Sequence, residues 1–302
     1  MEIWEEKKNI DNIPHIHARN EFAKNIANLD PEDILARYTY QSIQTADSLW
    51  KIIEKYCKIN KSGVGVELGA GTGLFSIAQI KRGGNKIYAV EIVPKMVEDI
   101  IPKLTNYFLR NESSKIIPVI GSFDRIKLPN NSVSYIFEYD SFHHSFDLSR
   151  TFEESYRILE KNGILILIDR CHPDSLTDHE INSLLSINLS KRQLKEMGLP
   201  TKENFSRRDI GENEYRKKEW LNAINNAGFK IHYFRTFYPL VKIKQVYWYL
   251  LSRHKNQEKN MRNLLYIYLA QKFGIHLNDY STITPMRETG FDYKTIAILV
   301  KS

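Results

Sequence analysis

Residues 64–73 read VGVELGAGTG, and this stretch constrains the fold more than any other part of the chain. The apolar run Val64–Leu68 has the length of a buried strand, and glycines follow at positions 69, 71 and 73. A helix is expected from about Leu74 to Lys81. Dinucleotide-binding sites place G-x-G-x-x-G between a strand and a helix, but the position of their last glycine is Leu74 here. The loop therefore lies between a strand and a helix, as a nucleotide-binding loop does, but its glycines have the spacing G-x-G-x-G.

Strands and helices continue to alternate up to about residue 170. The sequence predicts strands at Lys86–Val90, Lys115–Ile120, Val133–Phe137 and Gly163–Ile168, and helices at Pro94–Arg110 and Asp147–Glu160. The strands are continuous apolar runs, which is typical of parallel sheets buried on both faces. Such alternation implies right-handed βαβ crossovers and a doubly wound α/β sheet.

The two ends of the chain are expected to add helices. Asp30-Pro31-Glu32 has the composition of a helix start and predicts one long helix to about Cys57, preceded by irregular polar residues. Leu176–Met197 also reads as helical. A helix at Lys217–Ala227, a strand at Phe229–Phe237 and a last strand at Tyr293–Val300 complete the pattern.

About 55 residues separate the last two strands, far more than a hairpin loop needs. Two stretches of this insertion read as helices with aromatic faces, and basic residues outnumber acidic ones there. It is either a helical pair packed on the edge of the sheet or a lid over a substrate. From the N-terminal helix, Arg37, Tyr38 and Tyr40 could reach a site at the sheet, although ordinary helix packing explains them equally well.

The composition places the chain among ordinary globular proteins. It has 302 residues, of which 42% are hydrophobic and 26% charged. The 43 basic residues exceed the 36 acidic ones, which weakly favours acidic ligands or partners. Two distant cysteines make no disulfide framework, and no signal-peptide pattern or long apolar run is present. We therefore expect a cytoplasmic protein that does not bind membranes.

Five motifs carry a resemblance to the class I (Rossmann-like) S-adenosylmethionine-dependent methyltransferases. In order they are ELGAGTG (67–73), YAVEIVPKM (88–96), GSFDRIKLPNNSVSYI (121–136), SFHH (141–144) and RILEKNGILIL (157–167). The resemblance implies a mostly parallel seven-stranded sheet with an antiparallel last strand. It divides the chain into an N-terminal helical cap (1–61), a methyltransferase core (62–237 with 290–302) and a helical insertion (238–289).

The resemblance also implies a site for S-adenosylmethionine, which would leave as S-adenosylhomocysteine. Glu67 and the glycine loop would hold its methionine part, and Glu91 its ribose. The implied cofactor-binding residues are Glu67, Gly69, Ala70, Gly71, Gly73, Glu91, Ile92, Ser122, Phe123 and Tyr139. Ser122 stands where the family usually has an acid for the adenine amine, and Asp124 is a second candidate for that contact. Lys161-Asn162-Gly163 replaces the family's proline-glycine-glycine turn, and asparagine tolerates the left-handed conformation.

The candidate catalytic residues follow the strand at Val133–Phe137. They are Asp140, His143 and His144, in the stretch YDSFHH, where a substrate would lie beyond the carboxyl ends of the strands. The histidines could be a structural pair, could position a substrate, or could act as a general base, and His144 is expected to matter more for turnover. No metal is predicted. Cys171 reads as a buried thiol rather than a nucleophile.

These features predict methyl transfer to an oxygen or nitrogen of a small, anionic or sugar-type metabolite by in-line substitution. One alternative is an RNA methyltransferase that uses the basic insertion, but nucleic acid is the less favoured partner because the bases form no dense run. A second alternative is a cofactor-binding protein without catalysis. The sequence does not determine the oligomeric state.

Overall fold

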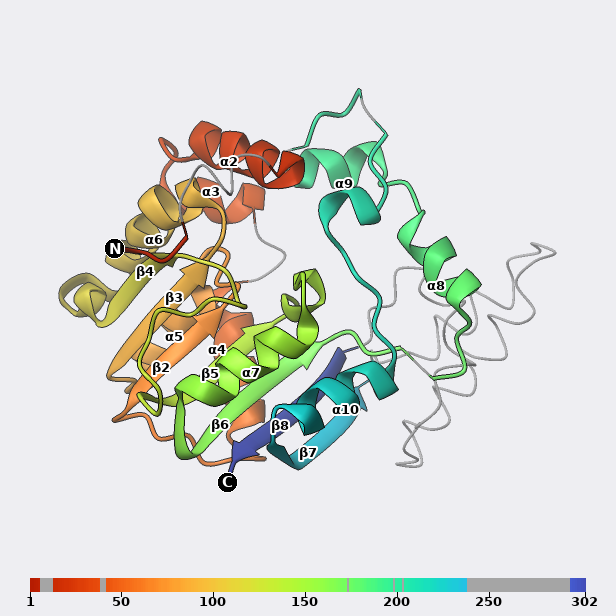
Figure 1. Ribbon diagram of the computed structural model, residues 1–302. Coiled ribbons are helices and arrows are strands. Elements are labelled where there is room, and N and C mark those ends of the chain that lie inside the picture. The colour runs from red at the N-terminus through yellow and green to blue at the C-terminus, as the bar shows by residue number, and fades with distance from the viewer. Residues whose placement is uncertain (6–12, 39–41, 173, 198, 203, 238–293) are drawn as a thin grey trace, which may run out of the picture.

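The computed structural model describes residues 1–5, 13–38, 42–172, 174–197, 199–202, 204–237 and 294–302 (Figure 1). The strands are β1 (Glu2–Ile3), β2 (Val64–Leu68), β3 (Lys86–Glu91), β4 (Ile116–Ile120), β5 (Val133–Tyr139), β6 (Leu159–Asp169), β7 (Phe229–Phe237) and β8 (Lys294–Lys301). The helices are α2 (Pro14–Ile26), α3 (Pro31–Tyr38), α4 (Ile43–Ile53), α5 (Leu74–Lys81), α6 (Ile101–Leu109), α7 (Leu148–Ile158), α8 (Asp178–Leu185), α9 (Lys191–Glu196) and α10 (Lys217–Asn226).

The strands form one sheet in the order β1-β4-β3-β2-β5-β6-β8-β7. The pairs from β4 to β6 are parallel, and β8 is antiparallel to both of its neighbours. The predicted doubly wound sheet with an antiparallel last strand is therefore confirmed. The predicted number of seven strands is one too low, because Glu2 and Ile3 add β1 to the edge beside β4. Trp4 anchors this strand, being 3% exposed with its ring 6.0 Å from that of Tyr88.

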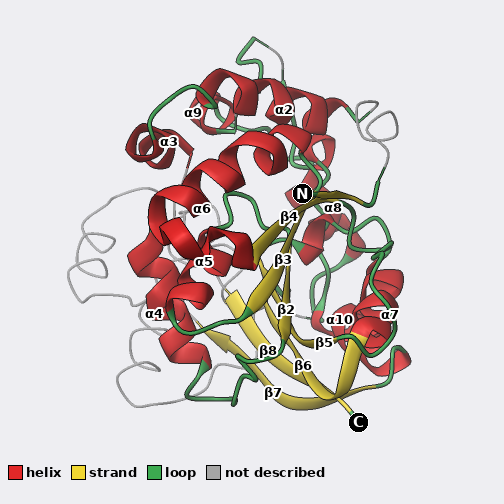
Figure 2. Ribbon diagram, turned by 90° about the vertical axis from the view of Figure 1, so that its left-hand side faces the viewer, coloured by secondary structure: helices red, strands yellow, loops and turns green. Residues whose placement is uncertain are grey.

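Helices cover both faces of the sheet (Figure 2). On one face, Tyr135 and Phe137 of β5 pack with Trp50 of α4. Ile136, between them in sequence, packs on the other face with Trp220 of α10. Because successive strand residues point to opposite faces, β5 is buried on both sides, as its continuous apolar sequence predicted.

The register of the sheet places the carboxyl ends of β2, β3 and β5 next to one another. Leu68, the last residue of β2, lies opposite Val90 of β3 on one side and opposite Glu138 of β5 on the other. The chain order reverses at β2 and β5, so the loops after these strands diverge and leave a crevice between them. The glycine loop, Glu91 and the stretch after β5 therefore share the same edge of the sheet.

The N-terminal helices differ from the sequence-based expectation. The single helix predicted from Glu32 to Cys57 is wrong, since α3 ends at Tyr38 and α4 begins at Ile43. Ser42 starts the new helix, and its side chain accepts a hydrogen bond from the Thr45 N–H. The residues expected to be irregular before residue 30 instead form α2, which buries Ile16 and Ile26.

Leu176–Met197 is likewise two helices and not one. Thr177 caps α8 and Ser190 caps α9, each in a capping box with the residue three positions later. Figure 1 shows α2 and α9 side by side beyond the carboxyl edge of the sheet, and Ala18 of α2 packs against a small cluster of Leu194, Leu199 and Ile210.

The division into a cap (1–61), a core (62–237 with 290–302) and an insertion (238–289) stays a prediction, and the insertion lies outside the described residues.

Among the residues that are described, no helix is both long and apolar enough to cross a membrane.

Candidate functional site

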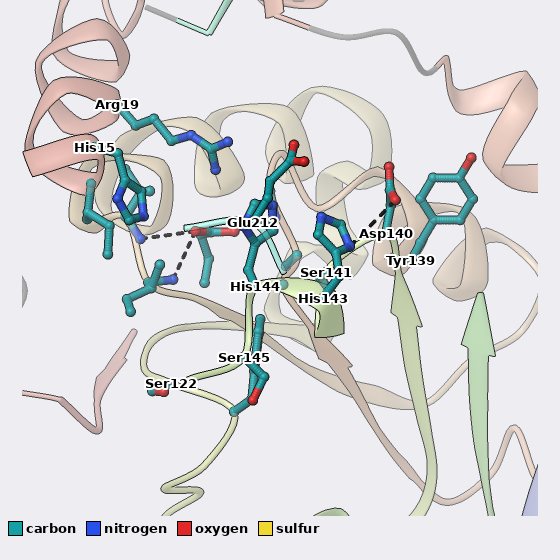
Figure 3. Close-up of a pocket in the computed structure, with 18 of the residues that line it drawn as sticks. His15, Arg19, Ser122, Tyr139, Asp140, Ser141, His143, His144, Ser145 and Glu212 are labelled. Atoms are coloured by element: carbon teal, nitrogen blue, oxygen red, sulfur yellow. Dashed lines mark hydrogen bonds and ion pairs between the residues drawn. The ribbon is translucent and has the colours of Figure 1, made fainter. Parts of the chain in front are cut away.

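A cavity of about 500 Å³ opens at the carboxyl edge of the sheet (Figure 3). Among the sequence-predicted site residues, all but Gly73 line it, namely Glu67, Gly69, Ala70, Gly71, Glu91, Ile92, Ser122, Phe123, Tyr139, Asp140, His143 and His144. Gly73 instead is the residue that caps the start of α5, and it packs close to Ile101. The volume lies within the roughly 300–1,000 Å³ range usual for small-molecule sites.

The glycine loop needs its glycines for two separate reasons. Gly69, Gly71 and Gly73 all have positive φ, between 53° and 76°, which other residues adopt at a cost. A Cβ on Gly69 would lie 2.4 Å from the Cβ of Ser141, so the loop after β2 closely approaches the loop after β5. A Cβ on Gly71 would meet no atom within 4 Å, and Gly71 therefore presents bare backbone to the cavity.

Glu91 closes one side of this loop with its carboxylate. Its Oε2 accepts a hydrogen bond from the Gly71 N–H at 2.8 Å, and its Oε1 accepts from Ile92 at 2.9 Å and Val93 at 3.0 Å. A carboxylate offers about four acceptor positions. About one remains for a hydroxyl group of a ligand, unless the bond to Gly71 opens.

Glu67 lies on the other side of the loop and is 3% exposed. Its Oε2 accepts hydrogen bonds from the backbone N–H, at 2.9 Å, and the hydroxyl of Ser76. Burial raises the pKa of Glu67 to about 8, against the lowering effect of the Ser76 bonds. The side chain is therefore largely protonated at neutral pH.

Two aromatic contacts flank the cavity. Phe123 lies with its ring centroid 5.5 Å from that of Phe142, and Tyr139 stacks on Phe75 at 4.8 Å. The Ser122 hydroxyl donates to Asp124, so the two candidates for an adenine contact are bonded to each other.

A sharp turn follows β5. Asp140 has φ of 55°, a conformation that aspartate tolerates better than most residues, and one turn of 3₁₀-helix (Phe142–His144) comes next. Fully buried Glu138 holds this turn: its Oε2 accepts hydrogen bonds from the Ser141 hydroxyl at 3.0 Å and from the Ser141 N–H at 3.2 Å. Burial and the nearby Asp169 raise the pKa of Glu138 well above its ordinary value.

His143 is paired with a carboxylate. Its Nδ1 lies 2.7 Å from Oδ1 of Asp169, the last residue of β6, and its backbone N–H donates to the other oxygen at 2.9 Å. Both side chains are almost fully buried. Because a carboxylate accepts, Nδ1 carries the proton in the neutral ring, and the lone pair is on Nε2.

His144 is bonded to the backbone instead. Its Nδ1 lies 3.1 Å from the carbonyl oxygen of Gly211, which can only accept, so Nδ1 of the neutral ring is again the protonated nitrogen. Burial, followed by electrostatic interactions with His143, Arg19 and Arg170, lowers the pKa of His144 well below its ordinary value. His144 is therefore neutral at physiological pH.

The segment from Arg207 to Arg216 supplies Glu212 to one wall of the cavity, and a network of buried ion pairs holds this wall in place. Arg170 lies 3.2 Å from Glu212 and 3.5 Å from Asp140, and Arg207 pairs with both Glu212 and Glu214. Glu214 is also bonded to His172. Asn213 donates from its side chain to the backbone oxygens of His143 and Ser145, both at 3.0 Å. The ion pairs therefore hold this wall together, and Asn213 holds the histidine turn against it.

Helix α2, with His15 and Arg19, and helix α9, with Gln193 and with Met197 directly after it, supply the remaining wall. Burial, and next the charge of Arg19, lowers the pKa of His15 to about 4. The sequence left open whether Arg37 reaches the site or only takes part in helix packing; Arg37 is exposed and is not among the residues that line the cavity. The side chain of Tyr38 and the whole of Tyr40 lie outside what the structure describes.

Sequence reasoning missed His15, Arg19 and Glu212, and it did not pair Asp169 with His143. The sequence did place Asp169 at this edge of the sheet, where the strand beside β5 ends, but not its contact with His143. No local pattern marks the other three, because they reach the cavity from segments far away in the sequence.

Asp140, His143 and Asp169 place one ligand atom each within 4.8 Å of one another, a spacing that a metal ion could use. However, His143 Nδ1 is within hydrogen-bond distance of Asp169, and the Arg170 guanidinium already lies beside Asp140. That no metal is held stays a prediction.

Cys171 is 4% exposed and burial raises its pKa to about 12, so little reactive thiolate forms.

Comparison with known proteins gives a consistent picture. Residues 66–167 match the family described as methyltransferase domain. An uncharacterized methyltransferase-like protein of Schizosaccharomyces pombe is 30% identical over 118 residues, which are 39% of this chain and 42% of that protein. The match thus spans less than half of that relative.

Two solved structures share the fold. One is a proposed sarcosine dimethylglycine methyltransferase from Galdieria sulphuraria, with a TM-score of 0.52 and 19% identity over 86% of this chain and 85% of that chain. The other is geranyl diphosphate methyltransferase in complex with GPP and sinefungin, with a TM-score of 0.52 and 12% identity over 84% and 77%. At these identities the likeness concerns the fold alone.

Proposed function

We propose that this chain, a class I methyltransferase by its domain and fold, transfers a methyl group from S-adenosylmethionine to an oxygen or nitrogen of a small metabolite. The observation that carries the proposal is the continuity of the cavity. It runs from the glycine loop and Glu91 to the histidine turn after β5, so cofactor and acceptor could lie in one enclosed space.

The residues present suit the cofactor. Gly71 leaves open space where a side chain would otherwise project, and the Glu91 carboxylate keeps about one acceptor position for a ribose hydroxyl. Glu67 and the rest of the loop would surround the methionine part, while Ser122, Phe123 and Tyr139 would border the remainder. When bound, S-adenosylmethionine would supply an electrophilic methyl group attached to a positively charged sulfur.

His143 is the better candidate for the base that takes a proton from the acceptor. Asp169 fixes its ring with the lone pair on Nε2, and the same carboxylate would stabilise the positive ring once the proton has moved. This reverses the sequence-based preference for His144. The lowered pKa of His144 makes it a weak base, better suited to accepting a hydrogen bond that holds the acceptor in line.

The test has two stages. Calorimetric titration of the full chain with S-adenosylhomocysteine should show binding, and a matched Gly71→Val variant should lose it. The chain is then incubated with S-adenosylmethionine and a panel of small hydroxy and amino compounds, and release of S-adenosylhomocysteine is followed. Absence of cofactor binding by the folded protein would refute the proposal; binding without turnover on any acceptor would favour the non-catalytic alternative.

A further inference from the structure

Arg19 lies where it can contact a substrate. It belongs to α2, its side chain is half-buried, and it lines the cavity with His15, one helical turn earlier. Figure 3 shows its guanidinium reaching from α2 toward the side of the cavity where His144 lies.

Arg19 differs from the other arginines around this site. Arg170 and Arg207 share the carboxylate of Glu212, and buried Arg216 pairs with Asp178. Within the described part of the chain, no carboxylate lies at ion-pair distance from Arg19. The guanidinium therefore keeps its hydrogen-bond donors available on the cavity side.

The acids that also line this part of the cavity are already engaged. Glu212 is held by two arginines, and Asp140 lies 3.5 Å from Arg170 and 3.7 Å from His143. The charge of Arg19 instead acts on two uncharged rings, since it lowers the pKa of both His15 and His144 in addition to burial. An anion that enters here would find a positive charge without a counter-charge.

We propose that Arg19 binds a carboxylate or phosphate group of the methyl acceptor and so selects small anionic substrates. A planar guanidinium donates two parallel hydrogen bonds to either group. The role as acceptor rests on the proposed methyl transfer, whereas the binding of an anion does not. Anchored at Arg19, the substrate extends past His144 toward His143, which orients its reacting atom at the end of β5.

The experiment measures anion binding directly. Benzoate, phenyl phosphate and the neutral analogue benzamide are titrated into the full chain by calorimetry at constant ionic strength, with and without S-adenosylhomocysteine. Wild type should bind at least one anion about tenfold or more tightly than benzamide, the range expected for charge-assisted hydrogen bonds. Benzoate and phenyl phosphate distinguish a carboxylate site from a phosphate site.

Arg19→Gln should remove the preference for the anion, whereas Arg150→Gln, on the exposed face of α7, should keep it. Arg19→Lys keeps the positive charge but lacks the planar guanidinium with its two parallel donors, so it should retain only part of the preference. This variant also tests the inference if Arg19→Gln fails to fold. Binding of both anions no tighter than that of benzamide by wild type, or unchanged anion binding by the folded Arg19→Gln protein, would overturn the inference. Anion binding without any S-adenosylhomocysteine binding would instead refute the proposed function alone.

Discussion

The imidazole of His143 is held by the carboxylate of Asp169, 2.7 Å from its Nδ1, although 26 residues separate the two in sequence. The pair joins the turn that follows β5 to the end of β6, the adjacent parallel strand. It turns a loop histidine into one with a fixed orientation and a defined tautomer, which is the property a general base needs.

Asp169→Asn should therefore lower turnover with little change in cofactor affinity. The amide can hold the wrong ring tautomer, with its proton on Nε2, and general base catalysis typically contributes roughly 10²- to 10⁴-fold. Steady-state kcat and KM, together with calorimetric binding of S-adenosylhomocysteine, separate the two effects. Asp174→Asn, in the exposed chain after β6, is the control. A rise in KM with unchanged kcat would contradict the role given to Asp169.

The two histidines should respond differently to removal. His143→Ala should lower kcat, because it removes the proposed base, while His144→Ala should mainly raise KM for the acceptor. Each variant is compared with wild type in kcat, in KM and in binding of S-adenosylhomocysteine, which neither change should alter by more than a few-fold. Equal, mild losses in both variants would instead indicate that the histidines form a structural pair.

Glu91→Ala should weaken cofactor binding by roughly 1–3 kcal/mol, the range for leaving polar partners unsatisfied. The carboxylate would be lost both to the ligand hydroxyl and to the Gly71 N–H, which it holds at 2.8 Å. Calorimetric titration with S-adenosylhomocysteine measures the change, and Glu112→Ala on the surface serves as the control. Undiminished affinity would refute the assignment of Glu91 to the ribose.

Glu67 should make the stability of the empty protein depend on pH. Burial raises its pKa from 4.5 to about 8, so the folded state binds a proton that the unfolded state releases between these values. The stability contributed by this proton is fully present below pH 4.5 and is lost as pH rises toward 8, at most about 1.4 kcal/mol per pH unit.

Glu67→Gln, which resembles the protonated acid, should therefore gain stability relative to wild type as pH increases from 5 to 8. Urea unfolding of both proteins at several pH values measures the difference. Parallel curves for the two proteins over that range would show that Glu67 does not carry a raised pKa.

The ion-pair wall predicts a loss of stability when one partner is removed. Arg170→Met removes the cation shared by Glu212 and Asp140, and removing one partner of a buried pair typically costs roughly 3–5 kcal/mol. Because Glu212 keeps Arg207 and Asp140 is partly exposed, the loss should lie at or below the lower end of that range. Arg125→Met, on a side chain that is 71% exposed, should change stability little. Urea unfolding of the two variants tests this, and equal stabilities would mean that the network does not stabilise the wall.

Local patterns predicted the sheet well. Val64–Leu68, Leu74–Lys81 and Phe229–Phe237 have the predicted bounds, and Asn162 has the left-handed conformation expected of it, with φ of 63°. These features depend on residues close in sequence. The breaks between α3 and α4 and between α8 and α9 depend on the capping residues Ser42 and Ser190. The sequence-based prediction gave more weight to the helical patterns on either side than to these single residues.

The site was predictable only on the side built by the sheet. Strand ends bring the glycine loop, Glu91 and the histidine turn together, and the order of the motifs indicates this. The opposite side depends on packing between distant segments: Gly211, which fixes the His144 ring, lies 67 residues further along the chain. A single sequence, read without an alignment, contains no signal for such a contact.

The packing of α2 on α9 has a consequence for exchange between the cavity and solvent. Among the described residues, Ala18 of α2 and Leu194 of α9 meet in a small cluster whose buried apolar residues are Leu194, Leu199 and Ile210, whereas the sheet is covered by far larger clusters. Local opening requires less free energy where little apolar surface is buried. The backbone amides of α9 should therefore exchange with deuterium well before those of β2, and ligands could enter by transient separation of this helix pair while the sheet beneath stays folded.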